Sequence, residues 1–247
     1  MISMQQPMSA NCRAQQLASL VDHVTGRSVA SRPPRPLSAS RGTLRAPAGA
    51  EPVAFESALE RDFLVFCRTE PRVKEVRAQQ LQIHYWDRKR QTHRRYTPDF
   101  VVEFDGGAGL TSAIVEVKRS QDLWRSRCQM RCAYAAARVW AAGQPNTIFR
   151  VVTDRLMAGN WIINARLLSA SLDRACDVAA ISACSELFAS GEPRQLGAVL
   201  LQARELGLNP DTILGAVYRM VALGQLDLDR GHPITMTTWV TRHEAPK

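Results

Sequence analysis

Three charged residues occur at a spacing suited to metal-dependent hydrolysis. Asp99 opens an apolar stretch, and Glu116 and Lys118 lie in a second apolar stretch beyond a glycine-rich turn. On a β-strand, residues two apart project from the same face, so Glu116 and Lys118 would lie side by side. A hairpin would bring Asp99 next to them. Two carboxylates and a lysine at a sheet edge can form a magnesium site of the kind that hydrolyses phosphodiesters.

The pair Pro98-Asp99 followed by Glu116-Val117-Lys118 resembles the PD-(D/E)xK nuclease signature. A surface hairpin with cross-strand ion pairs is the alternative interpretation of the same residues. The apolar flanks favour the nuclease site. Residues 100–102 and 114–115 are typical of buried strands, where an unpaired glutamate and lysine would be out of place.

Glu60 is the candidate for a third metal ligand. Residues 55–68 are predicted to form an amphipathic helix, because Phe55, Leu59 and Phe63 recur at four-residue spacing. The sequence Ser57-x-x-Glu60 also fits a capping box at a helix start, which is a purely structural role. The two roles can coexist.

The elements predicted around these residues follow the order αβββαβ, the core order of the restriction-endonuclease-like α/β fold. They are a helix over 55–68, strands near 76–86, 96–104 and 112–118, a helix over 121–142 and a strand near 147–153. With this order, further motifs resemble the TnsA endonuclease subunit of heteromeric cut-and-paste transposases. These motifs are Phe55-Glu56-Ser57-x-x-Glu60, Gln79-x-x-x-Ile83-x-Tyr85, Tyr96-Thr97-Pro98-Asp99-Phe100, Glu116-Val117-Lys118 and Phe149-x-Val151-Val152-Thr153-Asp154.

The resemblance covers about residues 50–155 and implies a function for each motif residue. Glu60, Asp99 and Glu116 would hold one or two magnesium ions, with manganese as an alternative. Lys118 would orient the attacking water and offset charge on the scissile phosphate. The chain would nick the 5′ ends of a mobile element. Its implied partners are a DDE-type transposase subunit (TnsB-like), which cuts and joins the 3′ ends, and an AAA+ ATPase regulator (TnsC-like).

The charge distribution favours DNA as a partner. The chain of 247 residues has a net charge of +9 and a pI near 9.7, which suits a polyanion. Two basic clusters flank the predicted site in sequence. The first is a predicted phosphate-binding hairpin with Arg88, Lys89, Arg90, Arg94 and Arg95, and the second is a helical phosphate clamp with Arg125, Arg127 and Arg131. A solvated hairpin tip and helix face are the alternative.

Three regions are predicted along the chain. Residues 1–50 form a basic, proline- and arginine-rich leader that is expected to be largely disordered. Residues 51–158 form the nuclease domain. Residues 159–247 are predicted to be a winged-helix-like domain, with helices at 161–173, 177–189, 192–206 and 210–223 and a hairpin over 224–240. Their acidic balance favours protein docking over DNA binding. DNA contact through Arg194, Arg204 and Arg219 stays open.

Other function classes receive no support. No apolar run approaches the length of a membrane span, so neither export nor a membrane location is expected, and a cytoplasmic protein is predicted. The six cysteines lack metal or disulfide spacing, and no histidine-based catalysis is assigned. Two rival functions remain: an autonomous repair or restriction nuclease of the same fold, and a catalytically inactive DNA-binding adaptor.

Overall fold

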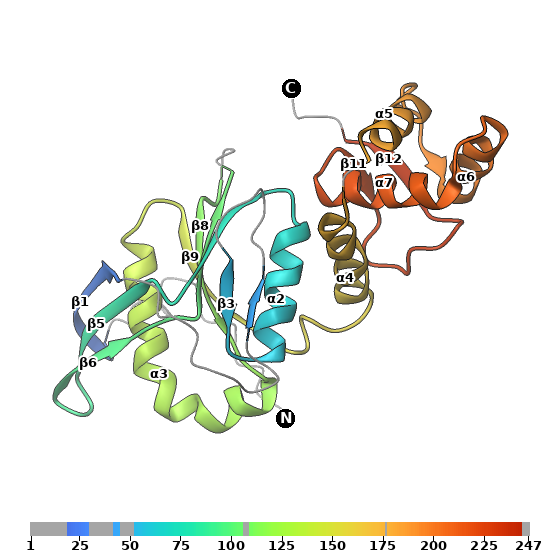
Figure 1. Cartoon of the computed structure of the whole chain (residues 1–247). Helices are drawn as coiled ribbons and strands as arrows, with labels where there is room; N and C mark the ends of the chain where they lie inside the picture. Colours follow the sequence, from blue (N-terminus) through green and yellow to red (C-terminus); the bar gives the residue numbers. More distant parts are fainter. Residues whose placement is uncertain (1–18, 30–41, 45–51, 106–108, 176, 244–247) are drawn as a thin grey trace, which may run out of the picture. The chain divides into compact units, whose positions relative to one another are not determined.

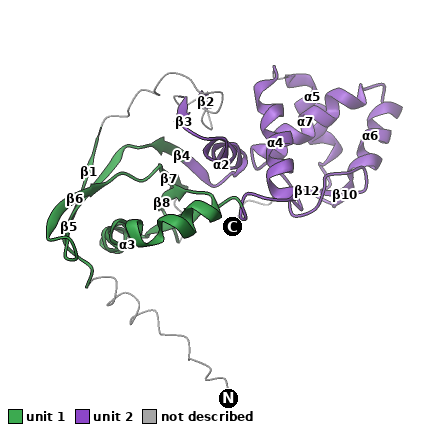
Figure 2. Cartoon of the chain, turned by 90° about the horizontal axis from the view of Figure 1, so that it is seen from below, with its two compact units in different colours: residues 1–35, 75–154 green, residues 36–74, 155–247 purple. Residues whose placement is uncertain are grey.

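The computed structural model describes residues 19–29, 42–44, 52–105, 109–175 and 177–243. The chain divides into two units (Figure 2). Unit 1 comprises residues 1–35 and 75–154, and unit 2 comprises residues 36–74 and 155–247. The described residues form a mixed α/β structure with six helices and several small sheets. None of the described helices is both long and apolar enough to cross a membrane.

The main sheet of unit 1 has the strand order β4-β7-β8-β9. Its neighbouring strands β8 and β9 are labelled in Figure 1. Its strands are β4 (Val73–Ala78), β7 (Phe100–Phe104), β8 (Ser112–Val117) and β9 (Thr147–Val152). β8 runs antiparallel to β7 and parallel to β9. Because β8 has a neighbour on each side, nearly all of its residues are buried, as its apolar run predicts.

Helix α3 (Ser120–Ala142) connects the parallel strands β8 and β9. A crossover of this kind is required because parallel strands cannot be joined by a tight turn. The C-terminal half of α3 is buried over residues 132–137, which are four alanines, Cys132 and Tyr134. These small side chains allow the helix backbone to approach the strands closely.

A second sheet of unit 1 has the order β1-β5-β6 and is antiparallel throughout. Its strands are β1 (Val21–Ser28), β5 (Leu81–Asp87) and β6 (Thr92–Tyr96). β1 lies inside the segment predicted to be a disordered leader. The structure differs there because β1 pairs along the whole of β5 and buries Val21 in the same core as β5. Most of the leader lies outside the described residues.

Two strands predicted as continuous are each divided between the sheets. The predicted strand 76–86 consists of β4 and β5, and the predicted strand 96–104 consists of β6 and β7. The chain leaves the main sheet at Gln79, whose φ of 51° is outside the range of strands, and returns through Thr97 and Pro98. The two switch points meet, since the Gln79 amide donates to the Asp99 carbonyl at 2.9 Å.

Unit 2 contains helix α2 (Ala58–Thr69) and helix α4 (Asn160–Asp173), which pack against each other. Val65, Ile162 and Ala165 form a small apolar cluster there. The Arg68 guanidinium, which is buried, forms two hydrogen bonds of 2.8 and 2.7 Å with the Asp173 carboxylate. Short strands β2 (Gly42–Leu44) and β3 (Val53–Phe55) form an antiparallel pair beside α2.

The C-terminal part of unit 2 alternates helices with short strands. The elements are α5 (Val178–Leu187), β10 (Arg194–Gln195), α6 (Leu196–Glu205), α7 (Pro210–Ala222), β11 (Leu226–Leu228) and β12 (Trp239–Arg242), with the strands in the order β10-β12-β11. Asn209 caps α7: its side chain accepts from the Asp211 amide, and Pro210 occupies the first turn. The helix predicted from residue 192 begins instead at Leu196, after β10.

Candidate active site

The end of β8 carries the first two predicted site residues. Glu116 is buried at 7% exposure, and Lys118 follows the last residue of the strand with its side chain 27% exposed. The Lys118 Nζ atom lies 3.8 Å from Glu116 Oε1. The two side chains therefore share one face of the strand, as their spacing predicts.

Asp99 meets β8 between these two residues. In the antiparallel pair of β7 and β8, Phe100 lies opposite Val115, so the next register position sets Asp99 opposite Glu116. The Asp99 carboxylate accepts a hydrogen bond of 2.7 Å from the Val117 amide through Oδ2. The structure thus brings Asp99, Glu116 and Lys118 together at the end of β8.

Two tyrosines that the sequence did not assign to the site hold the Glu116 carboxylate. Tyr96 Oη donates to Glu116 Oε2 at 2.6 Å, and Tyr134 Oη donates to Oε1 at 3.3 Å. Tyr96 ends β6, and Tyr134 comes from the buried half of α3. The only available signal for Tyr134 was a tyrosine within an alanine-rich buried run, because a buried phenol needs a hydrogen-bond partner.

The environment keeps both phenols protonated. Burial raises the pKa of Tyr96 most strongly, and the charge and hydrogen bond of Glu116 raise it further. The same causes, in the same order, raise the pKa of Tyr134. The charge of Asp99 also raises both pKa values. Each phenol is therefore a fixed donor that orients Glu116.

Glu60 forms the capping box that its spacing predicts. Its carboxylate accepts from the Glu56 amide at 2.8 Å and from Ser57 Oγ at 2.9 Å, while the Glu60 amide donates to Ser57 Oγ at 3.1 Å. α2 belongs to unit 2, whereas Asp99, Glu116 and Lys118 belong to unit 1. The assignment of Glu60 as a third metal ligand stays a prediction.

The donor atoms at the end of β8 fit a hard divalent cation. Within the described ranges, no three His, Cys, Asp or Glu side chains form a group that could hold a metal ion. Magnesium, however, is commonly bound through one or two carboxylates, with waters and substrate phosphate oxygens completing its shell. Asp99 and Glu116 supply two such carboxylates, and each oxygen that accepts one hydrogen bond retains acceptor capacity.

Two arginines of the predicted DNA-binding hairpin are already paired within the protein. Arg88 forms an ion pair with Asp22 of β1, and Arg90 Nη1 lies 2.8 Å from Asp87 Oδ2. Asp87 is fully buried, and its carboxylate also accepts hydrogen bonds of 3.1 Å from the backbone amides of Lys89 and Arg90. Asp87 and Arg90 therefore shape the hairpin turn.

The other cations of the two predicted clusters face solvent. Lys89, Arg94 and Arg95 are exposed on the hairpin, and they form no ion pair within the described part of the chain. The predicted clamp on α3 is also exposed, and its side chains form no ion pair with the described residues. These side chains are Arg125, Arg127 and Arg131. These six side chains remain available for phosphate groups, and their role in DNA binding stays a prediction.

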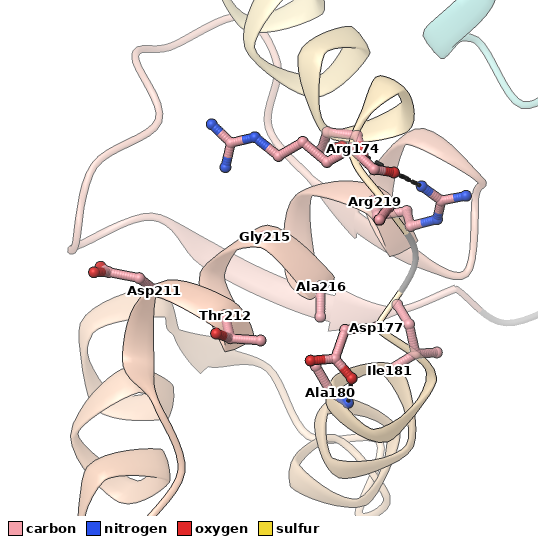
Figure 3. A pocket seen from close by; sticks show the side chains of 11 residues that line it. Arg174, Asp177, Ala180, Ile181, Asp211, Thr212, Gly215, Ala216 and Arg219 are labelled. Atoms are coloured by element: carbon pink, nitrogen blue, oxygen red, sulfur yellow. Dashed lines mark hydrogen bonds between the residues drawn. The ribbon is translucent and has the colours of Figure 1, made fainter.

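A pocket of about 280 Å³ in unit 2 lies where the end of α4 meets the starts of α5 and α7 (Figure 3). Arg219 in this pocket donates to the carbonyl oxygens of Ser171, Leu172 and Arg174, at 3.3 to 3.5 Å. Arg219 therefore caps the end of α4, in agreement with the preference of cations for helix C-termini. Arg194 is likewise engaged, with the Leu187 carbonyl at 2.7 Å.

Comparison with known proteins finds a family match for the region that contains the three site residues. No curated protein matches the chain. A family model described as TnsA-like endonuclease, N-terminal, matches residues 70–154. The matched segment includes Asp99, Glu116 and Lys118 and both tyrosines that hold Glu116. Residues 70–154 of this chain are therefore a TnsA-like endonuclease N-terminal domain.

Proposed function

We propose that this chain is a metal-dependent DNA endonuclease that serves as the 5′-end-cleaving subunit of a heteromeric transposase. One observation carries the proposal: Asp99, Glu116 and Lys118 converge at the end of β8 within a TnsA-like endonuclease domain. Phosphodiester hydrolysis is among the slowest uncatalysed reactions, so a catalyst must supply both a nucleophile and charge stabilisation. The three side chains provide the groups for these two tasks.

Each residue has a separate task in this proposal. Asp99 and Glu116 would hold a magnesium ion, which supplies Lewis-acid stabilisation and an activated water. Glu60 is kept as a third ligand on the basis of its sequence motif alone. Lys118 would orient the attacking water and offset the charge that develops on the scissile phosphate. Tyr96 and Tyr134 keep Glu116 in one orientation, which is the usual task of groups behind a ligand.

The fold supports the same interpretation. The order α2, β4–β8, α3, β9 is compatible with a restriction-endonuclease-like core in which the first and second predicted strands are divided. In unit 2 the order helix, strand, helix, helix, strand, strand with a three-stranded antiparallel sheet supports a winged-helix domain. Its engaged arginines, Arg194 and Arg219, support protein docking over DNA binding there.

The partners in this proposal follow from the TnsA-like family. A DDE-type transposase subunit would cut and join the 3′ ends and supply end recognition, and an AAA+ ATPase would couple both to the target. Residues 159–247 would be the docking domain for this machinery. The chain alone would then cut DNA poorly, because end recognition would come from the transposase subunit.

Plasmid nicking with magnesium or manganese tests the proposal. The chain is assayed alone and with the TnsB-like transposase subunit that the proposal requires, on supercoiled DNA carrying the element's ends. Wild type is compared with Asp99→Asn and Lys118→Met. The Asp99→Asn side chain keeps an oxygen that can accept from the Val117 amide, so this substitution removes the charge with little change to the local fold.

We expect cleavage at the 5′ ends that requires the partner and falls more than about 100-fold in both variants. Equal cleavage without the partner would replace the transposase proposal with an autonomous nuclease. An absence of cleavage under every condition, with transposition unchanged in both variants, would leave a DNA-binding adaptor.

A further inference from the structure

The N-terminal half of α3 presents an indole ring to solvent. Trp124 is 65% exposed, more than any other described tryptophan. Its neighbours Leu123 and Met130 pack against the core of unit 1, so the indole occupies a different side of the helix. The Arg127 guanidinium carbon lies 4.0 Å from the centroid of the Trp124 ring, which is cation–π geometry.

This side of α3 forms a continuous stripe. Trp124, Arg127, Cys128 and Arg131 are at positions i, i+3, i+4 and i+7, which share one helix face, and the stripe is largely exposed. The face combines one large aromatic surface with two guanidinium groups. An indole that is exposed to this extent contributes little to the core that its neighbours build, so core packing does not explain a tryptophan at this position.

We infer that Trp124 and Arg127 form a binding site for an unpaired DNA base near the nuclease site. The indole would stack on the base, and the guanidinium groups of Arg127 and Arg131 would bind the flanking phosphates. Base–aromatic stacking is independent of sequence, because every base has a π-face. Arg127 is suited to a double role, since a guanidinium can stack on a ring and donate hydrogen bonds to a phosphate at its edge.

Charge favours a nucleic acid over a protein as the occupant of this face. Residues 118–138 contain six positive residues and one negative residue, a net charge of +5. The single carboxylate, Asp122, lies in the first turn of the helix. Polyanions bind such surfaces readily, whereas a protein partner would need a complementary acidic face.

An unpaired base is favoured over duplex DNA because of the shape of the contact. In a duplex each base is covered on both faces by its neighbours, so an indole can stack only at an end or at an opened step. A helix face that bound duplex through phosphates alone would need only arginines. The indole therefore selects for a strand whose bases are unstacked.

The position of Trp124 connects this site to cleavage. α3 begins two residues after Lys118, and the Ser120 amide donates to Asp154 Oδ1 at 2.7 Å, which fixes the start of the helix. Trp124 follows four residues later, about 6 Å along the helix axis. If Lys118 contacts the scissile phosphate, as the proposed function requires, the stacked base lies within a few nucleotides of it. This part of the inference rests on the proposed function.

Binding to two forms of one DNA sequence tests the site. Fluorescence anisotropy is measured with the full chain, in EDTA to prevent cleavage, on a labelled single-stranded oligonucleotide and on its duplex. The variants are Trp124→Ala, Trp124→Phe and, as a matched exposed tryptophan in unit 2, Trp239→Ala. Thermal melts establish that each variant is folded, which is expected because both indoles are exposed.

We expect Trp124→Ala to raise the Kd for the single strand by roughly 10-fold, because stacking on one base is lost. The Kd for the duplex should change less than about 2-fold, since the phosphate contacts remain. Trp124→Phe should recover most of the single-strand affinity, and Trp239→Ala should leave it unchanged.

Equal losses on both DNA forms would overturn the inference, because the indole would then serve duplex binding. Unchanged binding in Trp124→Ala would also overturn it and would leave a protein as the occupant of the face. Because binding is measured without metal, the result is independent of the nicking assay. If wild type cleaves and Trp124→Ala binds both DNA forms as wild type does, the proposed function stands and this inference fails. If wild type does not cleave and Trp124→Ala loses affinity only for the single strand, the base-binding site stands, and its position beside the scissile phosphate fails with the proposed function.

Discussion

Tyr96 Oη donates a hydrogen bond of 2.6 Å to Glu116 Oε2, and both side chains are buried. This bond joins the last residue of β6 to the carboxylate at the end of β8, and so links the second sheet of unit 1 to the candidate active site. Because hydrogen bonds to charged groups are stronger than neutral ones, the bond contributes to both the stability of unit 1 and the orientation of Glu116.

Replacing Tyr96 by Phe separates these two contributions from packing. The variant keeps the ring and removes only the donor, so Glu116 loses one of its two phenol partners. We expect the free energy of unfolding to fall by about 1.5 to 3 kcal/mol and the metal affinity of the site to fall by about 10- to 100-fold. Urea denaturation and titration with manganese measure the two effects.

Tyr85→Phe is the control for this prediction. Tyr85 is also a buried tyrosine of the second sheet, and its hydroxyl forms no hydrogen bond with the described residues. Its replacement should leave metal affinity unchanged. Equal effects of the two variants on metal affinity would show that the Tyr96 bond does not orient Glu116.

Acid should weaken the hairpin turn through Asp87. Burial raises the pKa of Asp87, but hydrogen bonds from the Arg90 side chain and backbone outweigh it, so that the pKa lies below its usual value. A lowered folded-state pKa contributes stability above the unfolded pKa of about 4, and that stability is lost as pH falls through the folded-state pKa. Wild type should therefore lose stability below about pH 4.

Asp87→Asn tests this assignment. The variant should be less stable than wild type at neutral pH, because it loses the charge paired with Arg90. The difference between the two proteins in the free energy of unfolding should shrink as the pH falls below about 4. A difference that stays constant from neutral to acid pH would contradict the role of the charged form.

The two ion pairs between α2 and α4 should differ in strength. Arg68, whose side chain is 6% exposed, has Asp173 as its one carboxylate partner among the described residues, whereas Asp62, 14% exposed, is paired with both Arg166 and Arg61. Asp173→Asn leaves a buried guanidinium without its counter-charge and should cost about 2 to 4 kcal/mol. Arg166→Gln should cost less than about 1 kcal/mol. Thermal and urea denaturation measure both, and equal costs would contradict the second partner of Asp62 as the cause of the difference.

Replacing the exposed arginines of the basic hairpin should change DNA binding more than replacing its paired arginine. Replacing both Arg94 and Arg95 by Gln should weaken duplex binding and lower the slope of log K against log salt by up to about 1.8, since each phosphate contact contributes about 0.9. Arg88→Gln should change the slope less, because Arg88 is already paired with Asp22. Salt-dependent anisotropy measures the slopes, and a change of about 0.9 in Arg88→Gln would assign a phosphate contact to Arg88 as well.

The sequence alone determined those features that depend on local spacing. The two-residue step from Glu116 to Lys118 fixes a shared strand face, and the hairpin predicted between the two apolar runs brings Asp99 next to them. The capping box of Ser57 and Glu60 needs only the first turn of one helix, so its spacing predicted it correctly.

Only the tertiary structure decided features that join distant residues. The division of two predicted strands between two sheets depends on which neighbour each half pairs with, and no periodicity within either strand records that choice. Tyr134 reaches Glu116 only because α3 folds back over the sheet, and Arg88 is neutralised only because β1 pairs beside it. Local spacing fixes which face of an element a side chain occupies. The partner that the side chain meets on that face is set by long-range packing, and contacts between distant residues leave no regular spacing in the sequence.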